Sequence, residues 1–251
     1  MNDFLNVIDL NKSYDGIVAL DNFSCSVKSK EILGLIGPNG AGKSTLFNVI
    51  SGFISSDSGK VYFKGKNIIG KSPHKIALMG ISRTFQDLRL IRQITVLHNV
   101  LLSFNDQMGE KLVNVFFRSK KSNGLENLYR EKAMHLLEEA GIAERANDLA
   151  RNLSYGQQKL LSIVCCLASN ADLLFLDEPI AGINPAMINK ILSIINELPA
   201  KGKSVVLIEH NIDAIMQICH RVIFMNIGEK ICEGLPEKVR NDPKVIEAYI
   251  S

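Results

Sequence analysis

Residues 37–45 read G-P-N-G-A-G-K-S-T, and this short stretch constrains the fold more than any other part of the chain. It matches the pattern G-x-x-x-x-G-K-[ST], in which glycines let several backbone N–H groups turn toward one anion without a Cβ between them. Residues 31–36 (E-I-L-G-L-I) predict a buried strand before the loop, and residues 44–50 predict a helix after it. A strand, a glycine-rich loop and a helix N-terminus in this order form a binding site for a polyphosphate.

The residue types in this loop predict a role for each position. Lys43 is expected to reach the β- and γ-phosphates of a nucleoside triphosphate, and the hydroxyl of Ser44 is placed to bind Mg²⁺. The alternative is a chance glycine-rich turn, which the strand and helix on either side argue against. The residues expected to contact the nucleotide are Gly37, Pro38, Asn39, Gly40, Ala41, Gly42, Lys43, Ser44 and Thr45.

A second constellation lies at residues 173–179, which read L-L-F-L-D-E-P. The apolar run predicts a strand buried on both faces, so Asp177 and Glu178 should emerge at its carboxyl end, where α/β sheets bind ligands. Asp177 can hold the Mg²⁺ that Ser44 also contacts. Glu178 can orient an attacking water or accept its proton. The alternative is a surface turn with two solvated acids.

The rest of the chain alternates apolar strands with helices, and this pattern predicts a mostly parallel sheet with helices on both faces. Besides the strand and helix around the loop, strands are expected at residues 4–14, 23–27, 60–64, 80–85, 171–176, 204–208, 222–225 and 230–233. Helices are expected at residues 73–79, 159–168, 185–198, 211–219, 236–240 and 243–250.

Strand signals fade between residues 87 and 151. Residues 95–104 have helical spacing after a threonine cap, and residues 125–140 predict a second amphipathic helix. Residues 107–124 are polar and basic and contain glycine, which indicates an exposed loop or a variable helix. We therefore expect a helical insertion in the α/β core at residues 88–155.

Composition limits the class of protein. The chain has 251 residues, of which 46% are hydrophobic and 22% charged, as in ordinary globular proteins. A net charge of +3 with scattered basic residues gives no reason to expect a nucleic-acid partner. The longest apolar run, residues 160–169, is far short of the ~20 residues that span a bilayer. The first ten residues lack the basic start and cleavage site of a signal peptide, so we expect a cytoplasmic location.

A third stretch, L-S-Y-G-Q-Q at residues 153–158, precedes an apolar helix. A serine and a glycine at a helix start offer a hydroxyl and free N–H groups, which could form a second anion site, although many helices begin with serine. The glycine-rich loop, L-S-Y-G-Q and the D-E-P stretch, in this order and spacing, resemble the ATP-binding-cassette (ABC) ATPases. The resemblance covers essentially the whole chain.

The resemblance implies a fold. A cassette of this family has a P-loop NTPase (RecA-like) α/β core with a mostly parallel sheet, an antiparallel β edge subdomain and an inserted α-helical subdomain. The whole chain, residues 1–251, would then be a single ABC ATPase domain. Its core would comprise residues 1–87, including the β subdomain, and residues 156–228. The helical subdomain would be residues 88–155, and residues 229–251 would form a C-terminal extension.

The resemblance also implies roles for further residues. Tyr14 is similar in position to the aromatic that stacks on adenine, although from the residues alone it is equally suited to cover a sheet edge. Gln86 resembles the glutamine that senses Mg²⁺ and the attacking water, and His210 the histidine that contacts the γ-phosphate. Ser154 and Gly156 would cap the nucleotide of a second copy. The implied catalytic set is Lys43, Gln86, Glu178 and His210, and the implied Mg²⁺ ligands are Ser44, Gln86 and Asp177.

Within the family, the chain most resembles the ATPase subunits of branched-chain amino-acid importers. The resemblance is carried by residues 80–90 (G-I-S-R-T-F-Q-D-L-R-L), 177–185 (D-E-P-I-A-G-I-N-P) and 234–249 of the tail. Two positions depart from the general cassette pattern: Tyr155 replaces a glycine-type residue, and Asn184 replaces an aspartate. Both departures are shared with this subgroup, so they support the assignment.

The implied function is ATP hydrolysis that powers import of branched-chain or hydrophobic amino acids through separate membrane permeases. The implied partners are a second ABC ATPase, identical or different, the integral-membrane permeases and, indirectly, an extracytoplasmic substrate-binding protein. The chain would lie at the inner face of the membrane, with ATP and Mg²⁺ as its cofactors. The alternatives are the ATPase of a urea or amide importer or of a lipopolysaccharide exporter, a soluble cassette in DNA repair or translation, and a nucleotide-binding switch without hydrolysis.

Overall fold

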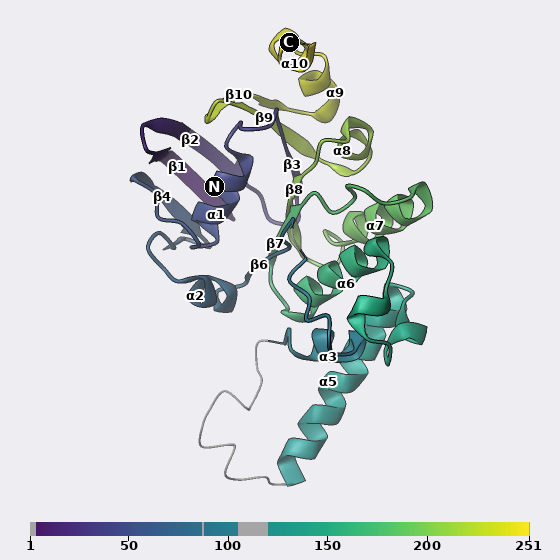
Figure 1. Ribbon diagram of the computed structural model, residues 1–251. Helices are drawn as coiled ribbons and strands as arrows, with labels where there is room; N and C mark the ends of the chain where they lie inside the picture. The colour runs from purple at the N-terminus through teal and green to yellow at the C-terminus, as the bar shows by residue number, and fades with distance from the viewer. Residues whose placement is uncertain (1–3, 87, 105–119, 251) are drawn as a thin grey trace.

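The structure, a computed structural model, describes residues 4–86, 88–104 and 120–250. Two sheets and the helices around them make up the described chain (Figure 1). The larger sheet has the strand order β10-β9-β3-β8-β7-β6. Strands from β9 to β6 run parallel to their neighbours, and β10 pairs antiparallel with β9. The bounds are β3 (Ile32–Ile36), β6 (Ile81–Arg83), β7 (Leu173–Asp177), β8 (Ser204–Ile208), β9 (Arg221–Asn226) and β10 (Glu229–Gly234).

The smaller sheet is antiparallel and lies beside the larger one, with the order β2-β1-β4-β5. The two sheets confirm the expected parallel core with an antiparallel β edge. The strand expected at residues 23–27 was too short, because a tight turn with positive φ at Asp15 and Gly16 lets Ile17 pair back onto Tyr14 at once. The bounds are β1 (Leu5–Tyr14), β2 (Ile17–Val27), β4 (Ser58–Phe63) and β5 (Lys66–Asn67).

Helix α1 (Lys43–Ile50) leaves the glycine-rich loop and lies between the two sheets (Figure 1). Its buried side chains join a cluster that includes one face of the larger sheet and the inner face of the smaller one. Phe47 of α1 meets Phe175 of β7 edge to face, with ring centroids 4.6 Å apart. This packing fixes α1 against the middle of β7.

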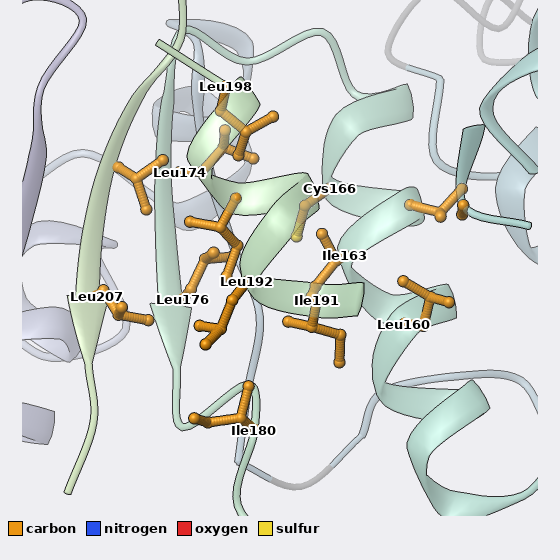
Figure 2. Close-up of a cluster of buried hydrophobic side chains, with 14 of the residues drawn as sticks. Leu160, Ile163, Cys166, Leu174, Leu176, Ile180, Ile191, Leu192, Leu198 and Leu207 are labelled. Carbon is orange, nitrogen blue, oxygen red and sulfur yellow. The ribbon is translucent and has the colours of Figure 1, made fainter. Parts of the chain in front are cut away.

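The opposite face of the larger sheet is covered by α6 (Tyr155–Ala168), α7 (Pro185–Glu197) and α8 (Ile212–Ile218). Figure 2 shows Leu174 and Leu176 of β7 pointing toward Ile163 of α6 and Ile191 of α7. Successive residues of β7 therefore serve different cores, because side chains alternate across a strand. The expectation of helices on both faces is confirmed.

The helical insertion contains α3 (Val96–Leu101), α5 (Lys120–Glu139) and two short 3₁₀ turns, Ala143–Arg145 and Ala150–Asn152. Thr95 caps α3 as predicted, because its side chain accepts a hydrogen bond from the backbone N–H of His98. Helix α5 begins before residue 125, so the end of the basic segment 107–124 is helical, and a helix tolerates its Gly124 at modest cost. Residues 105–119 lie outside the described part of the chain. The subdomain limits of 88 and 155 stay a prediction.

Three short helices complete the structure: α2 (Pro73–Leu78), α9 (Pro236–Arg240) and α10 (Pro243–Ile250). Each has proline at its first position, where the missing N–H is not needed. Ser72 is the N-cap residue of α2, but its side chain makes no capping hydrogen bond. No helix in the described residues combines the length and the apolar character that crossing a bilayer requires.

Glu31 and Arg221 join β2, β3 and β9 at the end of the sheet that lies away from the glycine-rich loop. The Arg221 guanidinium donates to both carboxylate oxygens of Glu31 at 2.8 and 2.9 Å, and to the carbonyl oxygen of Ser26 at 2.7 Å. Both ionic side chains are largely buried, and the hydrogen bond to Glu31 raises the pKa of Arg221. Glu233 is a second acidic partner of Arg221.

We expect Glu31→Ala to lower the free energy of unfolding by about 2 kcal/mol, measured by urea denaturation. This is less than the roughly 3–5 kcal/mol typical of breaking a buried pair, because Glu233 still balances the guanidinium. Glu139→Ala is the control: it breaks an exposed pair with Lys201 (2.8 Å) and should cost less than about 1 kcal/mol. Equal losses in the two variants would contradict a stabilising role for the buried pair.

Candidate functional site

A cavity of about 270 Å³ brings together five separate stretches of the chain, one of which contributes only Ala19 of β2. Gln86 enters from the loop after β6, Glu178 follows β7, and His210 follows β8. These strand ends converge on the glycine-rich loop because parallel strands present their carboxyl ends at one edge of the sheet. The loop contributes Asn39, Gly40, Ala41, Gly42, Lys43, Ser44 and Thr45 to the lining.

Glycine is required at two positions of the loop. Gly37 has φ +152°, and a Cβ there would lie 2.1 Å from the backbone oxygen of Met225. Gly42, the N-cap of α1, has φ +99°, and its Cβ would lie 2.3 Å from the backbone oxygen of Ala19. A side chain at either position would therefore displace the loop from the strands behind it.

Lys43 is held by the loop itself. Its ammonium group donates to the carbonyl oxygens of Gly37 at 2.7 Å and Pro38 at 2.9 Å. Burial lowers the pKa of Lys43, and the negative charges of Glu178 and Asp177 raise it. The loop carbonyls thus hold the ammonium in place, where it interacts electrostatically with Glu178 and Asp177.

Asp177 ends β7 and does not itself line the cavity. Its Oδ2 accepts a hydrogen bond from Nη2 of Arg83 at 2.9 Å, and both side chains are buried. Asn48 holds the other end of the guanidinium, where its Oδ1 accepts from Nη1 at 2.7 Å. Burial raises the pKa of Asp177, and Arg83 lowers it. Sequence reasoning missed Arg83, although it stands in the same R-T-F-Q stretch as Gln86.

The predicted Mg²⁺ ligands offer a hydroxyl (Ser44), an amide (Gln86) and one carboxylate (Asp177). Among the described residues, no group of three or more His, Cys, Asp or Glu side chains is placed to hold a metal ion. A site with one carboxylate suits Mg²⁺, which keeps waters and takes phosphate oxygens as further ligands. The donor set therefore fits a magnesium nucleotide, and its assignment stays a prediction.

Glu178 and His210 are in contact. Nε2 of His210 lies 3.1 Å from Oε1 of Glu178. Glu178 has φ +48°, in the left-handed region, and its backbone N–H donates to Ile208 of β8 at 2.9 Å. Such a conformation is uncommon for a residue with a long side chain and typically occurs where a functional group must be aimed. Here it turns the carboxylate toward the loop and the histidine.

Tyr14 ends β1 and is 40% exposed. The Lys12 ammonium lies 5.3 Å from the centroid of its ring. Tyr14 is not part of the cavity lining. Adenine stacking by Tyr14 therefore stays a prediction.

Ser154 and Gly156 lie at the start of α6, apart from the cavity lining of their own chain. Oγ of Ser154 accepts from the backbone N–H of Gln157 at 3.3 Å, and Oε1 of Gln157 accepts from the N–H of Ser154 at 3.0 Å. This capping box fixes the helix start. A Cβ at Gly156 would lie 3.0 Å from Met187 of α7, so the two helices approach closely here.

Asn184, which replaces the aspartate of the general cassette pattern, has a clear local role. It is the N-cap of α7, and its Oδ1 accepts from the backbone N–H of Met187 at 2.9 Å. Asparagine and aspartate cap helices about equally well, so the replacement preserves the start of α7. Two buried charges near the site, Lys159 and Glu209, were missed by sequence reasoning, because each stands at the boundary between an apolar run and polar residues, where an exposed charge is the ordinary expectation.

Comparisons with known proteins identify the family of this chain. The model of the ABC transporter family matches residues 20–181, and that of the branched-chain amino acid ATP-binding cassette transporter family matches residues 229–250. BraF of Pseudomonas aeruginosa, a high-affinity branched-chain amino acid transport ATP-binding protein, is 35% identical over 98% of this chain and 97% of its own length. LivG of Archaeoglobus fulgidus, a probable branched-chain amino acid transport ATP-binding protein, is 38% identical over 98% of this chain and 95% of its own length.

Solved structures have the same fold. The ADP conformation of MJ1267, an ATP-binding cassette of an ABC transporter, superimposes with a TM-score of 0.85 at 35% identity, and the match covers 100% of both chains. A dimeric post-hydrolysis state of the ATP-binding cassette MJ0796, bound to ADP and Pi, superimposes with a TM-score of 0.77 at 26% identity and covers 92% of this chain and 98% of that one.

Proposed function

This chain belongs to the ABC transporter family, and from that premise we propose that it is the ATP-hydrolysing subunit of an importer of branched-chain or other hydrophobic amino acids. The observation that carries the proposal is the single cavity that gathers the glycine-rich loop, Gln86, Glu178 and His210. The amino-acid substrate is supported by the names of the two relatives and by the family that matches the tail, residues 229–250.

The loop binds the triphosphate through its backbone N–H groups, the N-terminus of α1 and the ammonium of Lys43. Ser44, Gln86 and Asp177 would hold the Mg²⁺, whose charge offsets that of the phosphates. Arg83 orients the Asp177 carboxylate through its 2.9 Å hydrogen bond. These groups position the nucleotide before any bond changes.

Glu178 is the general base in this proposal. It accepts a proton from a water whose oxygen attacks the γ-phosphorus in line, as the bond from that phosphorus to the ADP oxygen breaks. His210, which lies 3.1 Å from Glu178, orients the carboxylate and contacts the γ-phosphate. Catalysis is then largely positioning and neutralisation of charge, as in other phosphoryl transfers.

Cassettes of this family work as pairs on membrane permeases. We propose that Ser154 and Gly156 close over the nucleotide of a second cassette, identical or different, which fits their position outside the cavity of their own chain. The dimeric MJ0796 relative supports such a pairing. The chain would then lie at the inner face of the membrane, held there by its permeases.

A second cavity, of about 280 Å³, suggests where a permease docks. It lies between the loop after β6 and the helical insertion, and Phe85, Arg89, Ile91 and Leu102 contribute to its lining. Ile91 and Leu102 are large apolar side chains that are 48% and 55% exposed. Gln86 lines the nucleotide cavity and Phe85, its neighbour in the chain, lines this second cavity. A displacement of Gln86 on ATP binding or hydrolysis would therefore move this surface directly.

Reconstitution tests the substrate. The full chain, with the membrane proteins that co-purify with it and the binding protein, is placed in proteoliposomes loaded with Mg·ATP. We expect uptake of labelled leucine, isoleucine or valine that requires ATP, and no uptake of urea. Uptake of urea alone would overturn the amino-acid assignment, and ATP-dependent efflux would overturn the direction of transport.

A further inference from the structure

Two buried charged side chains that the proposed reaction does not use lie beside the backbone of Glu178. Lys159 of α6 is 5% exposed, and Glu209, which follows β8, is 3% exposed. A charge is costly to bury unless other groups compensate for it, so the contacts of this pair should explain its presence.

Lys159 binds the backbone of the catalytic turn. Its Nζ donates to the carbonyl oxygen of Glu178 at 2.5 Å and lies 5.4 Å from the centroid of the Tyr155 ring. Burial lowers the pKa of Lys159, and the negative charges of Glu209 and Glu178 raise it. The ammonium therefore holds the carbonyl of a residue whose backbone is in the left-handed region.

Glu209 binds the other end of the same turn. Its Oε1 accepts from the backbone N–H of Ile180 at 2.9 Å. Burial raises the pKa of Glu209 to about 7, and the charge of Lys159 lowers it. Lys159 and Glu209 thus form hydrogen bonds with the backbone of residues 178 and 180 from two different elements. Glu209 is also next to His210 in the chain. Both ends of the turn that aims the Glu178 carboxylate are fixed by charged side chains.

Helix α6 carries both Lys159 and Ser154, the residue proposed to contact the nucleotide of a second cassette. Lys159 lies a little over one turn beyond Ser154 on the same helix. Leu160 and Ile163 of α6 are both fully buried, and Figure 2 shows Ile163 on the side of α6 that faces Ile191 of α7. A packed helix moves as a unit, so a displacement of its N-terminus carries the Lys159 ammonium with it.

We propose that Lys159 is a positioning residue that conveys the contact of Ser154 and Gly156 with a second cassette's nucleotide to Glu178 in its own chain. The inference rests on the proposed function, because it requires two cassettes that share their nucleotides. It assigns Lys159 no contact with the substrate. Its effect on hydrolysis passes through the backbone of Glu178.

The first test separates turnover from binding, using steady-state hydrolysis of Mg·ATP by the full chain. Lys159→Met should lower kcat at least about tenfold and leave KM within about twofold, while Lys159→Arg, which can still donate, should retain kcat within about threefold. Lys190→Met is the matched control, since Lys190 of α7 also donates to a backbone carbonyl, that of Gly141 at 3.1 Å, and should leave both constants unchanged. Thermal unfolding is measured on every variant, and Lys159→Gln replaces Lys159→Met if the latter does not fold.

The second test is a double-variant cycle with Ser154→Ala. If Lys159 conveys the effect of Ser154, the double variant should lose little more kcat than the worse single variant, because coupled residues are not additive. Multiplied losses, a wild-type kcat in Lys159→Met, or equal losses in the Met and Arg variants would each overturn the proposal. A wild-type chain without ATP turnover would instead defeat the proposed function itself, so the two failures are distinguishable.

Discussion

Replacing Glu178 with glutamine is expected to lower the rate of ATP hydrolysis at least about 100-fold, because an amide cannot accept the proton that a carboxylate takes from water. The side chain keeps its size and an oxygen that can face His210, so ATP should still bind with an affinity close to that of the wild type. Phosphate release measures the first effect, and titration with a fluorescent ATP analogue measures the second.

The same variant should accumulate a paired form when ATP is added, since the nucleotide that joins two cassettes is no longer consumed. Size-exclusion chromatography with light scattering would detect this form. Glu197→Gln is the control, because Glu197 is an exposed acid at the end of α7, apart from the cavity lining. Turnover at the wild-type rate in Glu178→Gln would show that another group takes the proton.

The second large effect is expected at Gly42. Gly42→Ala would place a Cβ 2.3 Å from the backbone oxygen of Ala19, in a backbone conformation that L side chains rarely adopt. The loop and the first turn of α1, which carries Lys43 and Ser44, would have to shift. Because several N–H groups must converge on one anion, we expect ATP affinity to fall at least about 100-fold, a loss of about 2.7 kcal/mol.

Gly65→Ala provides the matched control for Gly42→Ala. Gly65 has φ +74°, so alanine there bears a similar backbone strain, but its Cβ would have no atom within 4 Å. We expect Gly65→Ala to cost about 1 kcal/mol of folding stability and to leave ATP affinity unchanged. If the two variants bound ATP with equal affinity, the contact between a Cβ at position 42 and Ala19 could not be the cause of a lower affinity in Gly42→Ala.

The features that could be predicted from the sequence are those whose signal is local. The bounds predicted for β8, α9 and α10 match the structure, because a short apolar run or a proline at a helix start marks the limits directly. The strand-end position of Asp177 and Glu178 followed from the length of one buried run. Each of these inferences used only neighbouring residues and a rule about chain geometry.

The contacts that tune the site depend on which strands become neighbours, and the sequence alone does not reveal this. Arg83 is far from Asp177 in the chain and meets it only because β6 pairs with β7. Glu209 reaches the N–H of Ile180 because β7 pairs with β8. The left-handed backbone of Glu178 also depends on long-range contacts, since its own residue type disfavours that conformation.

That backbone conformation gives position 178 an unusual place in any effort to engineer this protein. Glycine, or to a lesser degree asparagine, would occupy the same φ with less strain, yet neither carries a carboxylate. Selection for heat resistance alone would therefore favour inactive sequences at this one position, and selection for transport would restore the acid. At position 178, in the turn after β7, selection for stability and selection for activity therefore favour different residues.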